Sequence, residues 1–357
     1  MQHASADPAA PQHLELGLDT FGDVTADSNG RMLSHAQVIR DLVDEAVLAD
    51  SLGVDFIGLG EHHRADFAVS APDVLLAAIA ARTSRIRLGS AVTVLSSDDP
   101  IRVFQRFATL DAISSGRAEV ILGRGSFTES FPLFGFNLNQ YEQLFEEKLD
   151  LFVEVLKEQP VTWKGTTRTP LNNHRVFPAT ESGSLKTWIG VGGSQASVVR
   201  AARYGLPLML AIIGGDPRRF APYVDLYQRA LRDAGNAMLP IGVHSHGYVA
   251  DTDEQARNEL FPPYKQMRDR IGGERGWPPM GRAEFDHEAD HGSLYVGSPE
   301  TVARRITATA TALGISRFDM KYSAGALSHD KMMRCVELYG SRVIPLVRDM
   351  LARPAAR

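Results

Sequence analysis

The sequence is poor in cysteine and has no long hydrophobic run. Of its 357 residues only Cys335 is a cysteine, which excludes a disulfide within the chain and a metal centre built from thiolates. No stretch of about 18 apolar residues is present, the length that a membrane-spanning helix needs. Residues 1–12 lack the basic region and apolar run of a secretory signal. We therefore expect a cytoplasmic protein with a loose N-terminal tail over residues 1–13.

Neither sign of charge dominates, and the basic residues form no block. The chain has 38 Lys and Arg against 43 Asp and Glu, a formal net charge of −5. Clustered basic residues attract phosphate polymers and anionic membrane surfaces, so we expect neither a nucleic acid nor a membrane as partner. Hydrophobic residues make up 44% of the chain, which is enough for the core of a large globular domain.

From Leu14 onward, short apolar runs alternate with longer amphipathic runs, the pattern of parallel strands that are each followed by a helix. Ser34 is expected to cap the first of these helices and Gly53 to end it. Eight repeats without a Pro/Gly/Ser-rich linker predict an α/β fold, a (β/α)8 TIM barrel over residues 14–350, rather than an open sheet. The expected strands are Leu14–Asp19, Phe56–Gly60, Ile86–Val94, Ala118–Gly123, Thr187–Val191, Leu208–Ile213, Ile241–Tyr248 and Arg317–Lys321.

Two segments interrupt this alternation. Pro160–Ser184 and Gly272–Ser298 are rich in Pro, Gly and Asn and are longer than ordinary connections, so we interpret both as insertions. Insertions that follow strands at the catalytic face of a barrel are candidates for lids and substrate walls. The sequence does not distinguish which of the two acts as a lid.

Two histidines directly follow the second expected strand. The carboxyl ends of barrel strands meet at one mouth, where active sites lie. His62 and His63 are therefore candidate catalytic residues, because imidazoles exchange protons near neutral pH. The structural alternative is that one of them only caps the strand end. Their spacing matches no zinc motif, and we predict no metal site.

The third and fourth strand ends carry candidate cofactor contacts. Ala91, Val92 and Thr93 lie in a run of compact residues that lets a flat ring approach the backbone. Gly123 and Arg124 place a guanidinium beside a glycine, an arrangement suited to clamping a phosphate or a carbonyl oxygen. The alternatives are ordinary barrel packing at the third strand and, at the fourth, an ion pair between Arg124 and a carboxylate such as Glu129.

A glycine-rich turn follows the fifth strand. Gly192, Gly193 and Ser194 lead into a helical run that includes Ser197. Exposed N–H groups at the positive end of that helix would hold a terminal phosphate. A plain βα turn is the structural alternative, and neither the P-loop nor the dinucleotide-binding fingerprint is matched.

Other polar residues are interpreted more simply. His244 and His246 alternate along the seventh strand and so share a face, which we interpret as a satisfied polar layer. Lys321 and Tyr322 end the last strand at the same mouth and are not in the candidate set.

Together these segments resemble the bacterial luciferase-like family of flavin-dependent oxidoreductases and monooxygenases. The similarity runs from Leu14 to about Arg348 and depends on the combination of motifs. The matching motifs are Glu61-His62-His63, Leu88 to Leu95, Asp99-Pro100-Ile101-Arg102, Leu110-Asp111, Ser115-Gly116-Arg117, Gly123-Arg124-Gly125 and Phe134-Gly135.

The resemblance implies a flavin ring that lies against a non-prolyl cis peptide, here Ala91-Val92, with His62 near its reacting edge. The other contacts that it implies are Arg124 at the polar tail or a ring oxygen and, at the phosphate, Gly193, Ser194 and Ser197.

The chain also departs from luciferases themselves. Glu142 stands near the place of their second arginine, so Arg200 or Arg203 must replace part of the phosphate clamp. The loop Arg64–Ala68 differs too, and we therefore expect neither a long-chain aldehyde substrate nor light emission.

The preferred hypothesis is a monooxygenase that uses reduced FMN and O2 on a small organic substrate. Because no nicotinamide motif is visible, we expect a separate flavin reductase to supply the reduced flavin. An F420-dependent hydride-transfer oxidoreductase on the same barrel and a non-catalytic flavin-binding protein remain alternatives. The resemblance also implies a homodimer.

Overall fold

Eight parallel strands close into a barrel in the computed structural model, which describes residues 14–27 and 29–353. The order around the barrel is β1-β2-β3-β5-β8-β9-β10-β12, and β12 pairs with β1. The predicted TIM barrel is confirmed, whereas the expected tail at 1–13 lies outside the described residues. The barrel strands are β1 (Glu15–Thr20), β2 (Phe56–Leu59), β3 (Arg87–Ser90), β5 (Ala118–Gly123), β8 (Lys186–Val191), β9 (Leu208–Ala211), β10 (Ile241–Val249) and β12 (Arg317–Lys321).

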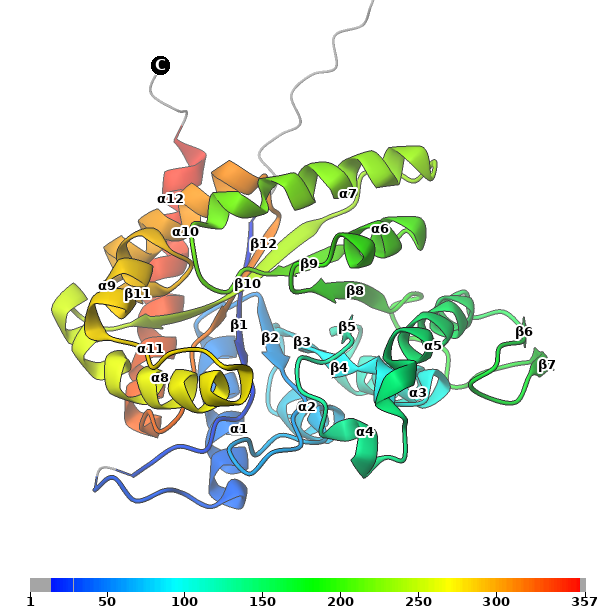
Figure 1. Ribbon diagram of the computed structural model, residues 1–357, viewed down its shortest axis with the longest axis horizontal. Coiled ribbons are helices and arrows are strands. Elements are labelled where there is room, and N and C mark those ends of the chain that lie inside the picture. The colour runs from blue at the N-terminus through cyan, green and yellow to red at the C-terminus, as the bar shows by residue number, and fades with distance from the viewer. Residues whose placement is uncertain (1–13, 28, 354–357) are drawn as a thin grey trace, which may run out of the picture.

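Helices surround the barrel and cover the outer faces of its strands (Figure 1). The first is capped as expected, because the side chain of Ser34 accepts a hydrogen bond from the backbone N–H of Gln37. The helices are α1 (His35–Ser51), α2 (Pro72–Ala80), α3 (Pro100–Ser114), α4 (Ser130–Leu133), α5 (Tyr141–Leu156), α6 (Gln195–Arg203), α7 (Ala221–Asp233), α8 (Asp253–Arg275), α9 (Arg282–His291), α10 (Pro299–Leu313), α11 (His329–Leu338) and α12 (Ile344–Ala352).

The third predicted strand is divided in the structure. β3 ends at Ser90, and a short β4 (Thr93–Val94) then pairs with β5. Between them lies the cis peptide bond Ala91-Val92, at the position that the family resemblance implies. Ala91 and Val92 pack against the apolar residues inside the barrel.

The barrel interior is apolar near the cavity and charged beneath it. Phe56, Ile121, Trp188 and Met209 form a separate apolar cluster inside the barrel. Arg317 lies against this cluster, with its guanidinium 3.5 Å from the centroid of the Phe56 ring.

Carboxylates neutralise this buried arginine. Glu119 accepts from Nη1 of Arg317 at 2.8 Å, and Asp319 accepts from its Nε at 2.9 Å. Glu119 also accepts from the indole of Trp188 at 2.8 Å, and all four side chains are buried. The charges are paired and hydrogen-bonded, as burial requires.

The two predicted insertions occupy different places. Residues 160–184 contain the antiparallel hairpin of β6 (Val161–Trp163) and β7 (Leu171–His174), at the edge of the molecule beyond α5 in Figure 1. Residues 272–298 are more regular than expected, since they contain the end of α8, the whole of α9 and β11 (Tyr295–Gly297), which extends the sheet beside β10.

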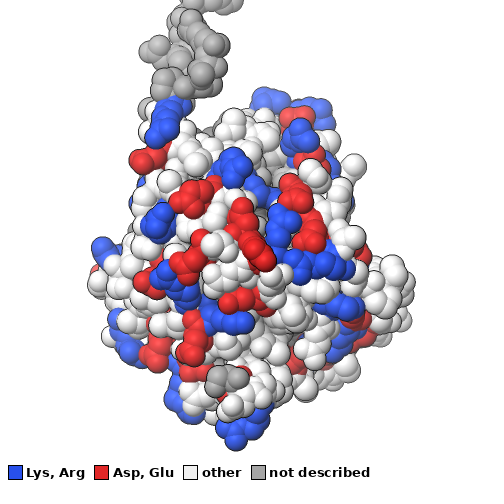
Figure 2. All heavy atoms as spheres, turned by 90° about the vertical axis from the view of Figure 1, so that its left-hand side faces the viewer, with Lys and Arg blue, Asp and Glu red and all other residues white. Residues whose placement is uncertain are grey.

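Basic and acidic side chains are interspersed on the face that Figure 2 shows. Ion pairs account for part of this mixture, among them Arg257 with Asp290 and Arg334 with Asp251. Among the described residues, no helix is long and apolar enough to cross a membrane.

Candidate active site

A cavity of about 550 Å³ lies at the carboxyl ends of the barrel strands, where barrel enzymes carry their active sites. Thr93 is not in its wall, because its hydroxyl donates to Ser90 Oγ at 2.8 Å in the buried interior. Gly193 lies just outside the wall, and its carbonyl accepts from the Tyr223 hydroxyl at 2.9 Å. The other predicted site residues line the cavity: His62, His63, Ala91, Val92, Gly123, Arg124, Gly192, Ser194 and Ser197.

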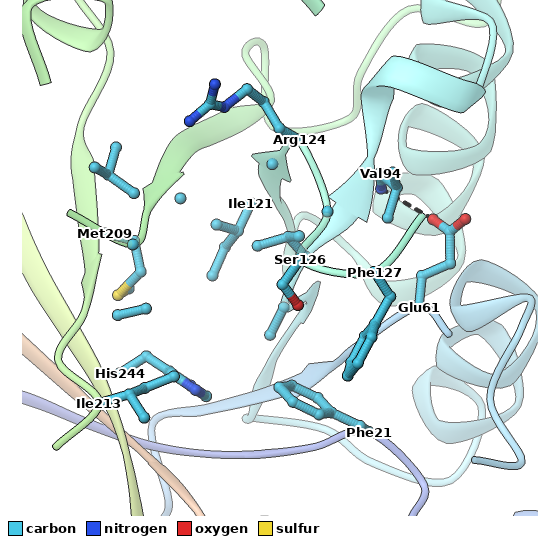
Figure 3. Close-up of a pocket in the computed structure, with 18 of the residues that line it drawn as sticks. Phe21, Glu61, Val94, Ile121, Arg124, Ser126, Phe127, Met209, Ile213 and His244 are labelled. Carbon is cyan, nitrogen blue, oxygen red and sulfur yellow. Dashed lines mark hydrogen bonds between the residues drawn. The ribbon is translucent and has the colours of Figure 1, made fainter. Parts of the chain in front are cut away.

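The cavity has a polar end and an aromatic end. Figure 3 shows Arg124 at one end and the rings of Phe21, Phe127 and His244 at the other. Ile121 and Met209 lie between them. A ligand with an anionic tail and a flat ring system matches this division.

The polar end is built at the start of α6. Ser194 is the N-cap of this helix, and its side chain accepts from the backbone N–H of Ser197. Arg200, one turn further on, donates to Ser197 Oγ at 3.4 Å. Backbone N–H groups, two hydroxyls and a guanidinium therefore converge where the helix dipole is positive, a donor set that fits a phosphate.

Glu142 connects the arginines at this end. Its carboxylate pairs with Arg124 and also accepts from Arg200 at 3.3 Å. The expected alternative of an ion pair at Arg124 is therefore present with Glu142, whereas Glu129, the example partner, pairs with Arg64 at 2.5 Å. Of the two arginines expected to complete the clamp, Arg200 lies directly behind the wall, in contact with Ser197.

Arg203 lies further out. Its side chain is 57% exposed and pairs with Glu146, whereas that of Arg200 is 12% exposed. Glu146 pairs with both arginines, so it holds the outer edge of the cluster together.

Glycine is required where the wall approaches the cis peptide. A Cβ on Gly123 would lie 2.5 Å from Val92 Cγ2, and one on Gly190 would lie 2.9 Å from Val92 Cγ1. Both distances are closer than side chains tolerate, so larger residues would displace Val92. A Cβ on Gly192 meets nothing within 4 Å, which leaves this backbone open to a ligand.

His62 lies in an aromatic cage. Its ring centroid is 4.7 Å from that of Phe21, 4.5 Å from that of Phe67 and 5.1 Å from that of Phe127. Burial lowers the pKa of His62 to about 3. The imidazole is therefore neutral near pH 7. It can donate or accept a hydrogen bond with a ligand, but it is not an imidazolium.

His63 is oriented by a carboxylate. Its Nε2 lies 2.9 Å from Glu61 Oε1, while Glu61 Oε2 accepts from the backbone N–H of Val94 at 3.0 Å. The second of these bonds is the dashed line in Figure 3. Glu61 thereby joins the loop after β2 to β4, beside the cis peptide.

His244 forms a buried ion pair inside the cavity, which the sequence interpretation missed. Its Nδ1 lies 2.6 Å from Asp19 Oδ2, and both residues line the wall. Burial alone would lower the pKa of His244, but the charge and hydrogen bond of Asp19 raise it above the ordinary value. His244 is therefore better suited than His62 to act as a protonated donor.

Asp319 is a third charged residue at the floor of the cavity, the inner surface where Asp19 and His244 lie. It lines the cavity and pairs with Arg317 beneath it. Burial, together with the nearby charges of Asp19 and Glu119, outweighs Arg317 and raises the pKa of Asp319 to about 6. A Cβ on Gly17 would lie 2.2 Å from Asp319 Oδ1, so only glycine at that position leaves room for this carboxylate.

Three other strand-end residues lie outside the cavity wall. The ammonium of Lys321 binds Asp23 at 2.8 Å and stacks over Phe21 at 4.7 Å. Tyr322 donates to Glu45. The ring centroid of His246 lies 5.7 Å from that of Tyr264, whereas His244 is hydrogen-bonded to Asp19 and lines the cavity.

One feature of the sequence could have indicated the pair of Asp19 and His244. Asp19 ends β1 and His244 lies on β10, and both strands pair with β12 between them. A carboxylate and a histidine on strands so close together can meet inside a barrel, but only the three-dimensional register shows that they do.

Comparison with known proteins assigns this chain to a family. A model of the luciferase-like monooxygenases matches residues 20–317. The chain belongs to the luciferase-like monooxygenase family. It is therefore an oxidoreductase, and the family resemblance stated from the motifs is confirmed.

Solved structures of luciferase-like proteins share the barrel. Monooxygenase RslO1 from Streptomyces bottropensis is 24% identical, with a TM-score of 0.80 over 93% of this chain and 99% of its own. The oxygenating constituent of 3,6-diketocamphane monooxygenase from Pseudomonas putida, solved with FMN, is 20% identical, with a TM-score of 0.74 over 93% and 98%.

A coenzyme F420-dependent relative has the same fold. The tetrahydromethanopterin reductase from Methanopyrus kandleri is 16% identical, with a TM-score of 0.66 over 93% of this chain and 99% of its own. At these identities the likeness establishes the fold and leaves the cofactor to be argued from the site.

Proposed function

We propose that this protein is a monooxygenase that uses reduced FMN and O2 to oxidise a small organic substrate. The observation that carries the proposal is the division of one cavity into an anion-binding end at Arg124 and Ser194 and an aromatic end at Phe21 and Phe127. When bound, reduced FMN supplies two electrons, with which one oxygen atom of O2 enters the substrate and the other leaves as water.

The chain's own residues bind the cofactor, shield the reacting region from water and supply a proton. Arg124, Arg200 and the start of α6 would hold the phosphate. The rings around His62 exclude water from the reacting region, and its neutral imidazole offers a hydrogen bond. His244, whose Nδ1 is engaged by Asp19, is left with Nε2 as the atom at which a proton is held for delivery.

FMN is preferred to F420 because of the charges beside the phosphate site. Glu142 and Glu146 stand next to the arginines there. F420 continues beyond its phosphate as a chain that carries further carboxylates, and the exposed Arg203 that could pair with one of them is already occupied by Glu146. FMN ends at its phosphate and has no such extension.

The proposal is tested by anaerobic titration of the purified protein with reduced FMN, oxidised FMN and F420. We expect reduced FMN to bind most tightly, and we expect substrate oxidation in air to require reduced flavin from an added flavin reductase. Binding of F420 alone would overturn the oxygen chemistry in favour of hydride transfer. Binding of FMN that yields only hydrogen peroxide with every compound tried would indicate a flavin-binding protein. Light scattering on the same preparation tests the expected homodimer.

Glu142 gives a more specific prediction about the phosphate. Its carboxylate occupies the two arginines that a phosphate would use, so E142Q should tighten FMN binding roughly 3–10-fold, a modest gain because the side chain is 61% exposed. Riboflavin, which lacks the phosphate, should bind the variant and the wild type alike. Calorimetry measures both affinities, and E154Q, on the same helix and paired with Lys157, is the matched control. Weaker FMN binding to E142Q would mean that Glu142 helps to build the clamp.

A further inference from the structure

The end of α8 covers the mouth of the cavity. Arg275, the last residue of this helix, and Trp277 just beyond it both line the cavity. Arg64, from the loop after β2, holds this end in place by pairing with Glu274 and, at 2.5 Å, with Glu129. Of the two predicted insertions, the one at 272–298 therefore contributes to the cavity wall, and no residue of the one at 160–184 does.

Arg275 differs from the other arginines around it. Arg268 pairs with Glu284 and Arg270 with Asp66, whereas Arg275 forms no ion pair within the described part of the chain. Its guanidinium lies 5.4 Å from the centroid of the Phe127 ring and 5.3 Å from that of the Trp277 ring. These rings hold the cation at the mouth without neutralising it.

Within the described residues the Arg275 side chain makes one hydrogen bond, which leaves most of its donors free. One Nη of Arg275 donates to the carbonyl of Ser126 at 3.1 Å. A guanidinium has five N–H donors, and a planar fork of two of them matches a carboxylate. The side chain is exposed, so these donors are accessible to a ligand at the mouth.

The carboxylates of the cavity wall already have side-chain partners. Glu61 is engaged by His63 and Glu129 by Arg64. On the floor, Asp19 is engaged by His244 and Asp319 by Arg317.

The arginines of the wall are not balanced in the same way. Arg124 has Glu142, but Arg219 and Arg275 have no ion-pair partner among residues 14–27 and 29–353. These two guanidinium groups are therefore available to an anionic ligand.

We propose that Arg275, held between Phe127 and Trp277, recognises the acidic group of a planar aromatic substrate, with the ring system of that substrate packed against these two rings at the mouth of the cavity. This assignment rests on the proposed function, because it takes the remaining space as the substrate site. An apolar body and one anionic oxygen group match the two kinds of surface that the mouth presents.

The experiment compares a naphthoate with its neutral amide by calorimetry on the flavin-loaded protein, repeated without flavin. We expect the acid to bind roughly tenfold more tightly than the amide, and R275Q to abolish that preference while leaving affinity for the amide unchanged. R275K keeps the charge without the planar fork and should retain part of the preference. Far-UV circular dichroism checks that each variant is folded.

Three results would overturn the assignment. These are equal affinity of the wild type for acid and amide, no measurable binding of a panel of aromatic acids, and loss of the preference in R219Q instead of R275Q. None of these results depends on turnover, so they are distinguishable from failure of reduced FMN to bind, which would overturn the proposed function instead.

Discussion

H244Q is expected to lower the turnover number for substrate oxidation roughly 100- to 1000-fold, the size of effect that loss of a positioned proton donor produces. FMN affinity should change much less, because the phosphate would be held at the opposite end of the cavity, by Arg124. Stopped-flow turnover with added reductase and a separate FMN titration measure the two quantities. H246Q, on the same strand but outside the cavity wall, is the matched control.

The pH dependence distinguishes a proton donor from a packing residue. Asp19 raises the pKa of His244 above the ordinary 6.5, so the imidazolium is present below that raised pKa and is lost as the pH rises through it. Wild-type turnover should fall along this alkaline limb, and H244Q should lack the limb. D19N should shift the limb to lower pH, since it removes the charge that favours the imidazolium. A wild-type profile in H244Q, with loss of activity in H62A alone, would contradict the assignment.

E119A is expected to have the largest effect on stability, a loss of about 3–5 kcal/mol in the free energy of unfolding, because it leaves Arg317 buried with one of its two closely paired carboxylates removed. The indole of Trp188 loses its acceptor as well. E119Q retains hydrogen bonding but not the charge, and should be less destabilised. Denaturant unfolding followed by circular dichroism measures both variants. Stability of E119A within about 1 kcal/mol of the wild type would mean that the interior relaxes or admits water.

The dependence of the free energy of unfolding on low pH tests the role of Glu119. Burial would raise the pKa of Glu119, but Arg317, Lys186 and Arg87 lower it to about 2, below the ordinary 4.5. Its contribution is therefore complete above about pH 4.5 and is lost as the pH falls from there toward 2. The stability difference between wild type and E119Q should shrink over that interval. Asp319 acts in the opposite sense, because its raised pKa makes its ionisation a cost as the pH rises toward 6.

The strands and most of the helices were predictable because their determinants are local. Ser34 precedes α1 as its cap, and Pro72 and Pro100 begin α2 and α3, where a missing N–H costs little. The helical content of residues 272–298 was not predictable from their Pro and Gly content. α9 is held by contacts such as Phe285 with Tyr264, whose ring centroids lie 5.9 Å apart, rather than by its own sequence pattern.

The site was predicted where its residues follow strand ends and missed where they depend on pairing across the barrel. His62, Arg124 and Ser194 stand beside recognisable strand ends, and all three line the cavity. Asp19 and His244 are 225 residues apart, and each taken alone is unremarkable. The protonation state of His62 could likewise not be predicted from the sequence, since its neutrality follows from burial among the three rings that surround it.

The charged layer beneath the cavity has a kinetic consequence. Arg317, Glu119 and Trp188 fill the barrel there and are completely or almost completely shielded from solvent, so the interior offers no passage to its far end. A substrate bound at Arg275 and Trp277, as proposed, would lie between solvent and the deeper part of the cavity. A molecule seated across the mouth traps whatever lies deeper, and the two residence times are coupled. Arrival and departure then follow an obligatory order, last in and first out.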